Sequence, residues 1–209
     1  MDQYLLQNSH ESVGSRISWW RLGGGYTTNV DEAQIYTQAE ALSQHQSREY
    51  DLPWPLSFVS PKTQLAVDCQ DVIEQPLSDL PADTECYVQA SRKWDGNDLY
   101  WITPKSGQSA NLQNAQIFSL AEASTQFGGE ANARSFVIWP KSYILSKTRR
   151  IANANTMTVS QALLNTGITL RQPKLTRRQA ISCSGCGRFI NEQQLWSGSC
   201  PNCDTDNRP

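Results

Sequence analysis

The chain has 209 residues, of which 38% are hydrophobic and 18% are charged, with a net charge of −2. This composition fits a soluble globular protein with one sizeable domain or two small ones, and no apolar run is long enough to cross a membrane. The first residues lack a basic segment followed by an apolar one, so we expect no secretory signal and a reducing, cytoplasmic location in which the six cysteines are thiols or metal ligands.

The first half of the chain predicts a strand, a loop, a helix and a second strand. Residues 16–22 are rich in β-forming side chains, and the three glycines at 23–25 favour a turn with positive φ. Thr37 and Glu40 have the spacing of a capping box, which predicts a helix of about ten residues from this point. We expect the module to close with a strand at 55–61.

The same order of features returns later in the chain. Residues 17–41 align without a gap with residues 99–123, and nine of the 25 positions are identical. Further on, we align the Ser-Phe-Val at 57–59 with the one at 135–137, and another strand is predicted at 83–94. The sequence therefore predicts an α+β fold made of two related strand–loop–helix–strand modules, at 15–82 and 83–145.

Residues 19–41 resemble a pattern found in short uncharacterised proteins of bacteriophages and other mobile elements. It joins an aromatic residue to Gly-Tyr-Thr-Thr, Val-Asp-Glu-Ala and a closing Thr-x-x-Glu-Ala. The resemblance implies a bacterial host cell, and the second module has lost the Tyr-Thr-Thr. One interpretation gives the tryptophans, glycines and glutamates that both modules share structural roles in the core, in turns and in helix caps. A binding interpretation instead predicts a groove lined by Trp20 and Tyr26.

Charge is distributed very unevenly along the chain. Residues 1–130 hold 17 acidic and 7 basic side chains, whereas residues 131–191 hold 10 basic side chains and no acidic one. We interpret residues 146–181 as a basic linker with a short helix after Thr158. We expect this basic segment to bind one of three partners. These are nucleic acid or a nucleoprotein complex, an acidic surface of a host protein, and the acidic body of the chain itself. The candidate binding residues are Lys147, Arg149, Arg150, Arg171, Lys174, Arg177, Arg178 and Arg188.

Four cysteines near the end of the chain have the spacing of a metal site. Two Cys-x-x-Cys pairs, Cys183/Cys186 and Cys200/Cys203, are separated by thirteen residues. Residues 182–206 resemble a zinc ribbon with a rubredoxin-type knuckle, which implies a four-thiolate structural zinc, with iron as the main alternative. We expect a hairpin that runs out along 188–191 and returns along 194–196. Phe189, Ile190, Leu195 and Trp196 are expected to form its apolar layer or to meet a partner.

No catalytic motif accompanies the cysteines. The two histidines, His10 and His45, lie outside any recognisable catalytic pattern. The sequence therefore favours a non-enzymatic, zinc-containing binding protein of phage type that engages nucleic acid or a nucleoprotein complex without a membrane, for example as an inhibitor of a host defence system. One alternative is a small metal-dependent nuclease or nucleotide-processing enzyme that uses carboxylates within 68–98. The other is a pure protein–protein adaptor.

Overall fold

The structure is a computed structural model, and it describes residues 2–130, 132, 134–171 and 181–208. The chain divides into two compact units, which cover residues 1–172 and 173–209. Helices and several small antiparallel sheets occur together, so the protein has the expected α+β fold.

The first unit begins with a five-stranded antiparallel sheet. Its strands are β1 (Gln3–Val13), β2 (Arg16–Trp20), β3 (Tyr26–Thr27), β4 (Tyr36–Thr37) and β5 (Asp51–Pro55). β1 pairs with β2, β4 and β5, and β3 pairs with β2. β2 matches the strand expected at 16–22. β1 was not predicted, because Tyr4, Leu5 and Leu6 are all buried and give no alternation of apolar and polar residues.

The helix α1 (Gln38–Ser47) begins at the predicted capping box. The Glu40 backbone N–H donates to the Thr37 hydroxyl, and the Thr37 backbone N–H donates to the Glu40 carboxylate at 2.8 Å. A short 3₁₀ turn, Val30–Glu32, precedes the helix, and the Asn29 side chain caps it by accepting from the Asp31 backbone N–H.

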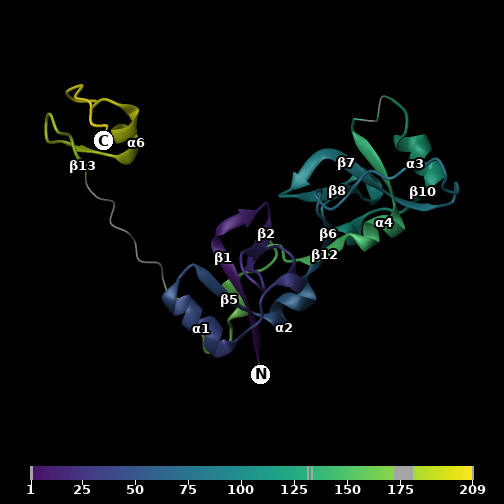
Figure 1. The fold of residues 1–209 in the computed structure, drawn as a ribbon, viewed down its shortest axis with the longest axis horizontal. Helices are drawn as coiled ribbons and strands as arrows, with labels where there is room; N and C mark the ends of the chain where they lie inside the picture. The colour runs from purple at the N-terminus through teal and green to yellow at the C-terminus, as the bar shows by residue number, and fades with distance from the viewer. Residues whose placement is uncertain (1, 131, 133, 172–180, 209) are drawn as a thin grey trace. The chain divides into compact units, whose positions relative to one another are not determined.

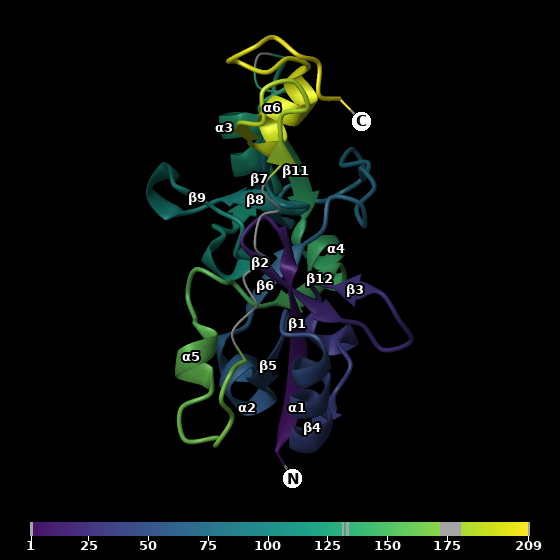
Figure 2. The same ribbon diagram turned by 90° about the vertical axis from the view of Figure 1, so that its left-hand side faces the viewer.

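A second five-stranded sheet follows in the same unit. Its strands are β7 (Glu85–Asp95), β8 (Asp98–Ile102), β9 (Gln108–Ser109), β10 (Phe118–Ser119) and β11 (Phe136–Pro140). β7 pairs with β8, β10 and β11, as β1 pairs with β2, β4 and β5. The helix α3 (Leu120–Phe127) starts at the capping box of Ser119 and Glu122. The loops that carry β3 and β9 project from their sheets (Figure 2).

The strand expected at 55–61 is wrong. β5 ends at Pro55, and residues from Leu56 form α2 (Leu56–Val59) and a 3₁₀ turn, Ser60–Lys62. The same change occurs at Pro140, where β11 ends and α4 (Lys141–Ser146) begins. Proline fixes φ for a first helical turn and cannot donate to a ladder. The Trp-Pro pairs at the ends of β5 and β11 therefore correspond, and the alignment of the two Ser-Phe-Val stretches was wrong.

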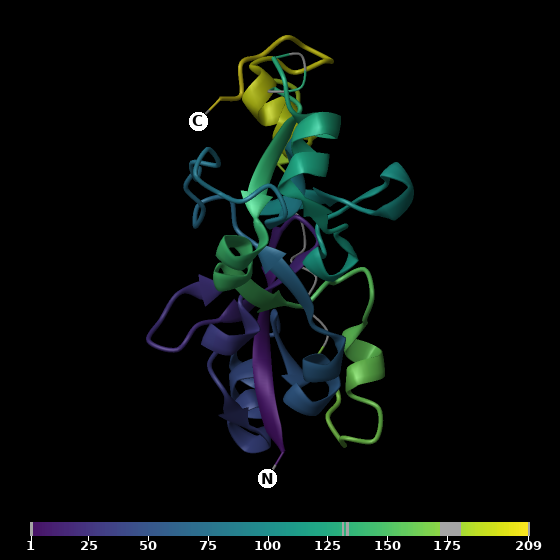
Figure 3. The same cartoon turned by 90° about the vertical axis from the view of Figure 1, so that its right-hand side faces the viewer.

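Two further strands lie where the two sheets meet (Figures 1 and 3). They are β6 (Gln64–Val67) and β12 (Thr148–Ile151), which pair antiparallel with each other. Val67 packs in the core of the second sheet with Trp101, whereas Ala152 packs in the core of the first sheet with Trp19. Val67 thus follows the first sheet in sequence but packs in the core of the second, and Ala152 follows the second sheet but packs in the core of the first. We call β6 and β12 the exchanged strands for this reason. Part of the expected basic linker, including β12 and α5 (Val159–Ala162), lies in this first unit.

The second unit contains a short hairpin and one helix, drawn in yellow in Figure 1. Its elements are β13 (Ile181–Ser182), β14 (Phe189–Ile190) and α6 (Glu192–Ser197). The returning strand expected at 194–196 is wrong. The Asn191 side chain accepts from the Gln194 backbone N–H at 2.7 Å, and the Gln194 side chain accepts from the Asn191 backbone N–H. This capping box starts a helix where a strand was predicted.

Candidate metal centre

Two tight turns of the second unit present the four cysteines. In the first, the Gly187 backbone N–H donates to the Cys183 carbonyl at 2.9 Å, and Gly187 has a φ of 73°. In the second, the Asp204 backbone N–H donates to the Cys200 carbonyl at 2.9 Å, and Asp204 has a φ of 59°. Each turn therefore folds two cysteines toward one point, and the left-handed residue comes directly after the second cysteine of each pair.

The four sulfur atoms converge on a single small volume. All four Sγ atoms lie within 4.8 Å of one another. The Sγ atoms of Cys183 and Cys203 are 3.6 Å apart, and those of Cys186 and Cys200 are 3.8 Å apart. A tetrahedral ion with bonds of about 2.3 Å to sulfur would separate its ligands by about 3.8 Å. The predicted ligands are thus positioned so that they could hold one metal ion, and their donors fit zinc or iron.

Hydrogen bonds to sulfur favour the thiolate form of Cys183. The backbone N–H of Cys186 is the largest influence that lowers the pKa of Cys183, to about 6. The backbone N–H of Gly185 and the side-chain amide of Asn207 also donate to this sulfur, each at 3.4 Å. Asn207 in turn accepts from the Ser184 backbone N–H at 2.9 Å. Asn207 was missed by sequence reasoning, because no spacing rule connects it with the first cysteine pair.

The apolar core of this unit is very small. Cys183, Ile190 and Cys200 are buried, and Ile181 and Leu195 pack against them. Phe189 is 77% exposed and Trp196 is 63% exposed. Of the four residues expected in the apolar layer, Ile190 and Leu195 therefore belong to it, whereas Phe189 and Trp196 face solvent. A core of this size cannot maintain a fold without a further constraint such as a metal.

The structure places the candidate basic residues in several environments. The Arg149 guanidinium is largely buried and bonds to Asp98 and Asp68, and Arg150 bonds to Asp31. The remaining residues differ: Lys147 lies over the Tyr143 ring, Arg171 donates to the Gln46 carbonyl, Arg188 is exposed, and Lys174, Arg177 and Arg178 lie outside the described residues. Two of the candidates are thus matched to acidic side chains of the same unit.

Trp20 and Tyr26, the residues expected to line a groove, contact each other. Their ring centroids lie 4.8 Å apart in an edge-to-face arrangement, and the Arg48 guanidinium lies 5.0 Å from the centroid of the Trp20 ring. Trp20 is partly buried and packs against the core beside α1, whereas Tyr26 is exposed.

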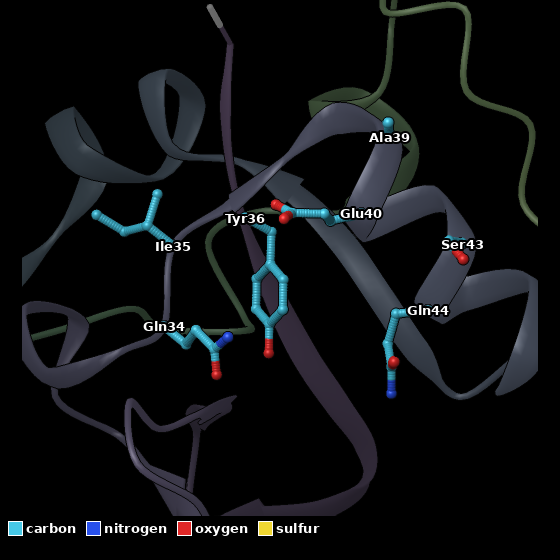
Figure 4. A pocket seen from close by; sticks show the side chains of 7 residues that line it. All are labelled: Gln34, Ile35, Tyr36, Ala39, Glu40, Ser43 and Gln44. Carbon is cyan, nitrogen blue, oxygen red and sulfur yellow. The ribbon is translucent and has the colours of Figure 1, made fainter.

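A surface hollow of about 530 Å³ lies over the start of α1, and neither Trp20 nor Tyr26 belongs to its lining. In Figure 4 the ends of the Gln34 and Tyr36 side chains point the same way, and the Glu40 carboxylate lies near the base of the Tyr36 side chain. Glu40 accepts hydrogen bonds from the Thr37 backbone and hydroxyl, which lower its pKa. Burial raises the pKa of Tyr36. The hollow therefore offers no group poised to exchange a proton near neutral pH.

Asp68 and Asp98, two of the carboxylates considered for a nuclease, are engaged in ion pairs. Asp98 is fully buried and bonds to Arg16 and Arg149, and Asp68 bonds to Arg149. Both ring nitrogens of the buried His45 are occupied, by the Asp51 carbonyl and the Arg171 backbone N–H. Among the residues that the structure describes, the four cysteines are the one group of three or more ligating side chains that converges.

Comparison of the chain with protein-family models, with curated protein sequences and with solved structures gave no match. Within the described part of the chain, no helix has both the length and the apolar character needed to span a membrane.

Proposed function

We propose that this chain is a non-enzymatic, zinc-containing binding protein whose second unit binds single-stranded nucleic acid. The observation that carries the proposal is the exposure of Phe189 and Trp196 on a unit with so few apolar side chains to bury. Aromatic faces held on a rigid platform stack on unpaired bases without strong sequence preference. Two large exposed rings on a small metal-stabilised unit are therefore what a stacking surface requires.

Zinc is the proposed ion, and its proposed role is structural. Four thiolates complete the tetrahedral shell of zinc, so no position remains at which a water molecule could be activated. The ion would connect the two turns and stabilise the hairpin of β13 and β14. The absence of a free coordination position favours a binding role over a hydrolytic one.

The charge of the neighbouring sequence supports an anionic partner. Arg188 is exposed and directly precedes Phe189, and residues 131–191 contain no acidic side chain. Arg149 and Arg150 are matched to carboxylates of the first unit, so we assign the phosphate contacts to Arg188 and to the basic residues that precede the metal centre in sequence. These are Lys174, Arg177 and Arg178.

We further propose that the first unit consists of two copies of one module. Trp19 and Trp101, 82 residues apart, are both buried, and the surrounding strands pair in the same pattern. The resemblance of residues 19–41 to phage proteins supports a mobile-element context. The excess of acidic over basic residues in 1–130 is compatible with a decoy for a nucleic-acid site of a host defence complex.

The proposal is tested by fluorescence anisotropy with the full chain and labelled single-stranded DNA and RNA at several salt concentrations. We expect Phe189→Ala and Trp196→Ala each to weaken binding about 5- to 100-fold, because each removes one stacking face. Arg188→Gln is expected to reduce the slope of log affinity against log salt by about 0.7. Trp94→Ala is the matched control, because Trp94 is also a half-exposed tryptophan but belongs to the first unit.

The alternatives give different outcomes in the same assay. Equal losses from Trp94→Ala and Trp196→Ala would contradict a specific stacking surface. Failure of micromolar protein to bind DNA or RNA in a salt-sensitive manner would favour the protein–protein adaptor. Turnover of labelled nucleic acid with added magnesium or manganese, abolished by one carboxylate substitution, would favour the nuclease.

A further inference from the structure

Residues 205–208, which we call the tail, follow the second cysteine turn and fold back along the second unit. The Cys200 backbone N–H donates to the Thr205 carbonyl at 2.9 Å, and the Asn207 backbone N–H donates to the Gly198 carbonyl at 3.4 Å. The tail therefore lies beside the residues that lead into the second turn, close to the metal centre.

Asn207 connects the tail with the first cysteine turn. Its Oδ1 accepts from the Ser184 backbone N–H at 2.9 Å and from the Ser184 hydroxyl at 3.2 Å. Its Nδ2 donates to the Cys183 sulfur at 3.4 Å and to the Thr205 carbonyl at 2.8 Å. Because a backbone N–H can only donate, the bond from Ser184 fixes which end of this half-buried amide faces sulfur.

Thr205 makes a second link, to the other cysteine pair. Its hydroxyl oxygen lies 3.3 Å from the Cys203 sulfur. A hydroxyl can donate to a thiolate, so the tail offers one donor to a sulfur of each pair. The first turn also packs directly on the tail, because a Cβ atom at Gly185 would overlap the Thr205 hydroxyl. The tail thus contacts both turns through a close fit.

Donors to sulfur matter for metal retention because the ligands carry a large negative charge. Four thiolates around one divalent ion leave a net charge of about −2. Arg208 is the one cation of the tail, and it is paired with Asp206 at 2.7 Å. Neutral N–H and O–H donors disperse the charge on sulfur without competing for the ion, and the loss of such an outer contact typically lowers metal affinity about 10- to 100-fold.

We propose that Asn207 and Thr205 are positioning residues of the metal centre. They form a clasp that holds the two cysteine turns together and slows the release of the ion. The clasp rests on the four-thiolate centre proposed above, and it assigns control of metal affinity to side chains outside the ligand set. Asn207 has the larger share, because it bonds to both Cys183 and Ser184 of the first turn.

Competition with a coloured chelator and stopped-flow measurement of ion release test the clasp in the full chain loaded with zinc. We expect Asn207→Ala to lower zinc affinity about 10- to 100-fold and to speed release by a similar factor. Asn207→Asp keeps an oxygen for Ser184 but places negative charge against sulfur, so it should lose at least as much. Thr205→Val should lower affinity about tenfold, whereas Thr205→Ser keeps the hydroxyl and should stay within about twofold of the unmodified chain.

Cobalt(II) in place of zinc separates donation to sulfur from general support of the fold. Its absorption includes a sulfur-to-metal charge-transfer band, and a donor to sulfur lowers the energy of the sulfur lone pair. Asn207→Ala and Thr205→Val should therefore shift this band to longer wavelength. Asn191→Ala is the matched control and should leave the band in place, because the Asn191 side chain caps α6 of the same unit by accepting from the Gln194 backbone N–H.

The outcomes distinguish failure of the clasp from failure of the metal centre. An unmodified chain that takes up neither zinc nor cobalt would remove both. If the unmodified chain binds one ion, an unchanged release rate in Asn207→Ala would overturn the clasp alone. Weaker binding with an unshifted cobalt band, as in Asn191→Ala, would contradict the contact with sulfur. Thr205→Val and Thr205→Ser keep the test decisive if Asn207→Ala takes up no ion, because equal losses in these two variants would contradict donation by the hydroxyl.

Discussion

At the scale of single residues, Gly187 and Asp204 occupy equivalent positions in the two cysteine turns. Both have positive φ, at 73° and 59°, and both donate their backbone N–H to the carbonyl of the first cysteine of the pair. Glycine adopts this conformation without steric penalty, and aspartate is among the few other residues that tolerate it. The departure from a second glycine, evident in the sequence, therefore leaves the geometry intact at a small energetic cost.

Substitution at Asp204 should change metal affinity, because folding of these turns and metal binding are one process. We expect Asp204→Gly to raise zinc affinity about two- to fivefold by relieving roughly 0.5–1 kcal/mol of backbone strain. Asp204→Val should lower it about tenfold, because a β-branched residue is poorly tolerated at positive φ. Competition with a coloured chelator measures both, and equal affinities of the two variants would contradict the argument.

At the scale of elements, local signals predicted the structure where the deciding interaction lies within a few residues. The boxes at Thr37 and Ser119 fix the starts of α1 and α3 through bonds three residues apart. The cysteine spacing likewise predicted the four side chains that converge. The strand at Gln3–Val13 and the hydrogen bond from Asn207 to Cys183 depend on distant partners, so no local pattern revealed them. The box at Asn191 and Gln194 is also a local signal, and it specifies the helix α6 where a strand was expected.

Removal of the metal should unfold the second unit while leaving the first intact. Only three buried side chains form the described core of the second unit, so we expect its folding free energy to come mainly from a bound ion. A strong chelator is expected to collapse the amide NMR dispersion of residues 181–208 and to release one ion per chain.

Cysteine substitutions provide the control for metal removal. Cys183→Ser should abolish stoichiometric metal binding, whereas Cys69→Ser should not, because Cys69 lies in the first unit and outside the sulfur cluster. Mass spectrometry of the native proteins measures metal content, and full occupancy of Cys183→Ser would disprove the four-thiolate site.

At the scale of the whole molecule, the two halves of the first unit are joined by an exchanged pair of strands and by a buried ionic network. The Arg16 guanidinium bonds to Asp98, which also accepts from Arg149. Arg16 and Asp98 lie 82 positions apart, at equivalent points of β2 and β8. Sequence reasoning placed Arg149 on a binding surface because the excess of positive charge was visible and its buried carboxylate partners were not. Only the tertiary structure reveals that neutralisation.

A double-mutant cycle tests whether this pair couples the two halves. Arg16→Met and Asp98→Leu should each lower the free energy of unfolding by about 3–5 kcal/mol, because each leaves a buried charge less well matched. The double variant should lose less than the sum by about 0.5–3 kcal/mol, because no lone charge remains of that pair. Urea denaturation in the presence of zinc, followed by tryptophan fluorescence, measures all three. The exposed pair Arg150 and Asp31 is the control, and its coupling should be below about 1 kcal/mol. Strict additivity at Arg16 and Asp98 would mean that the two halves are joined by apolar packing and strand pairing alone.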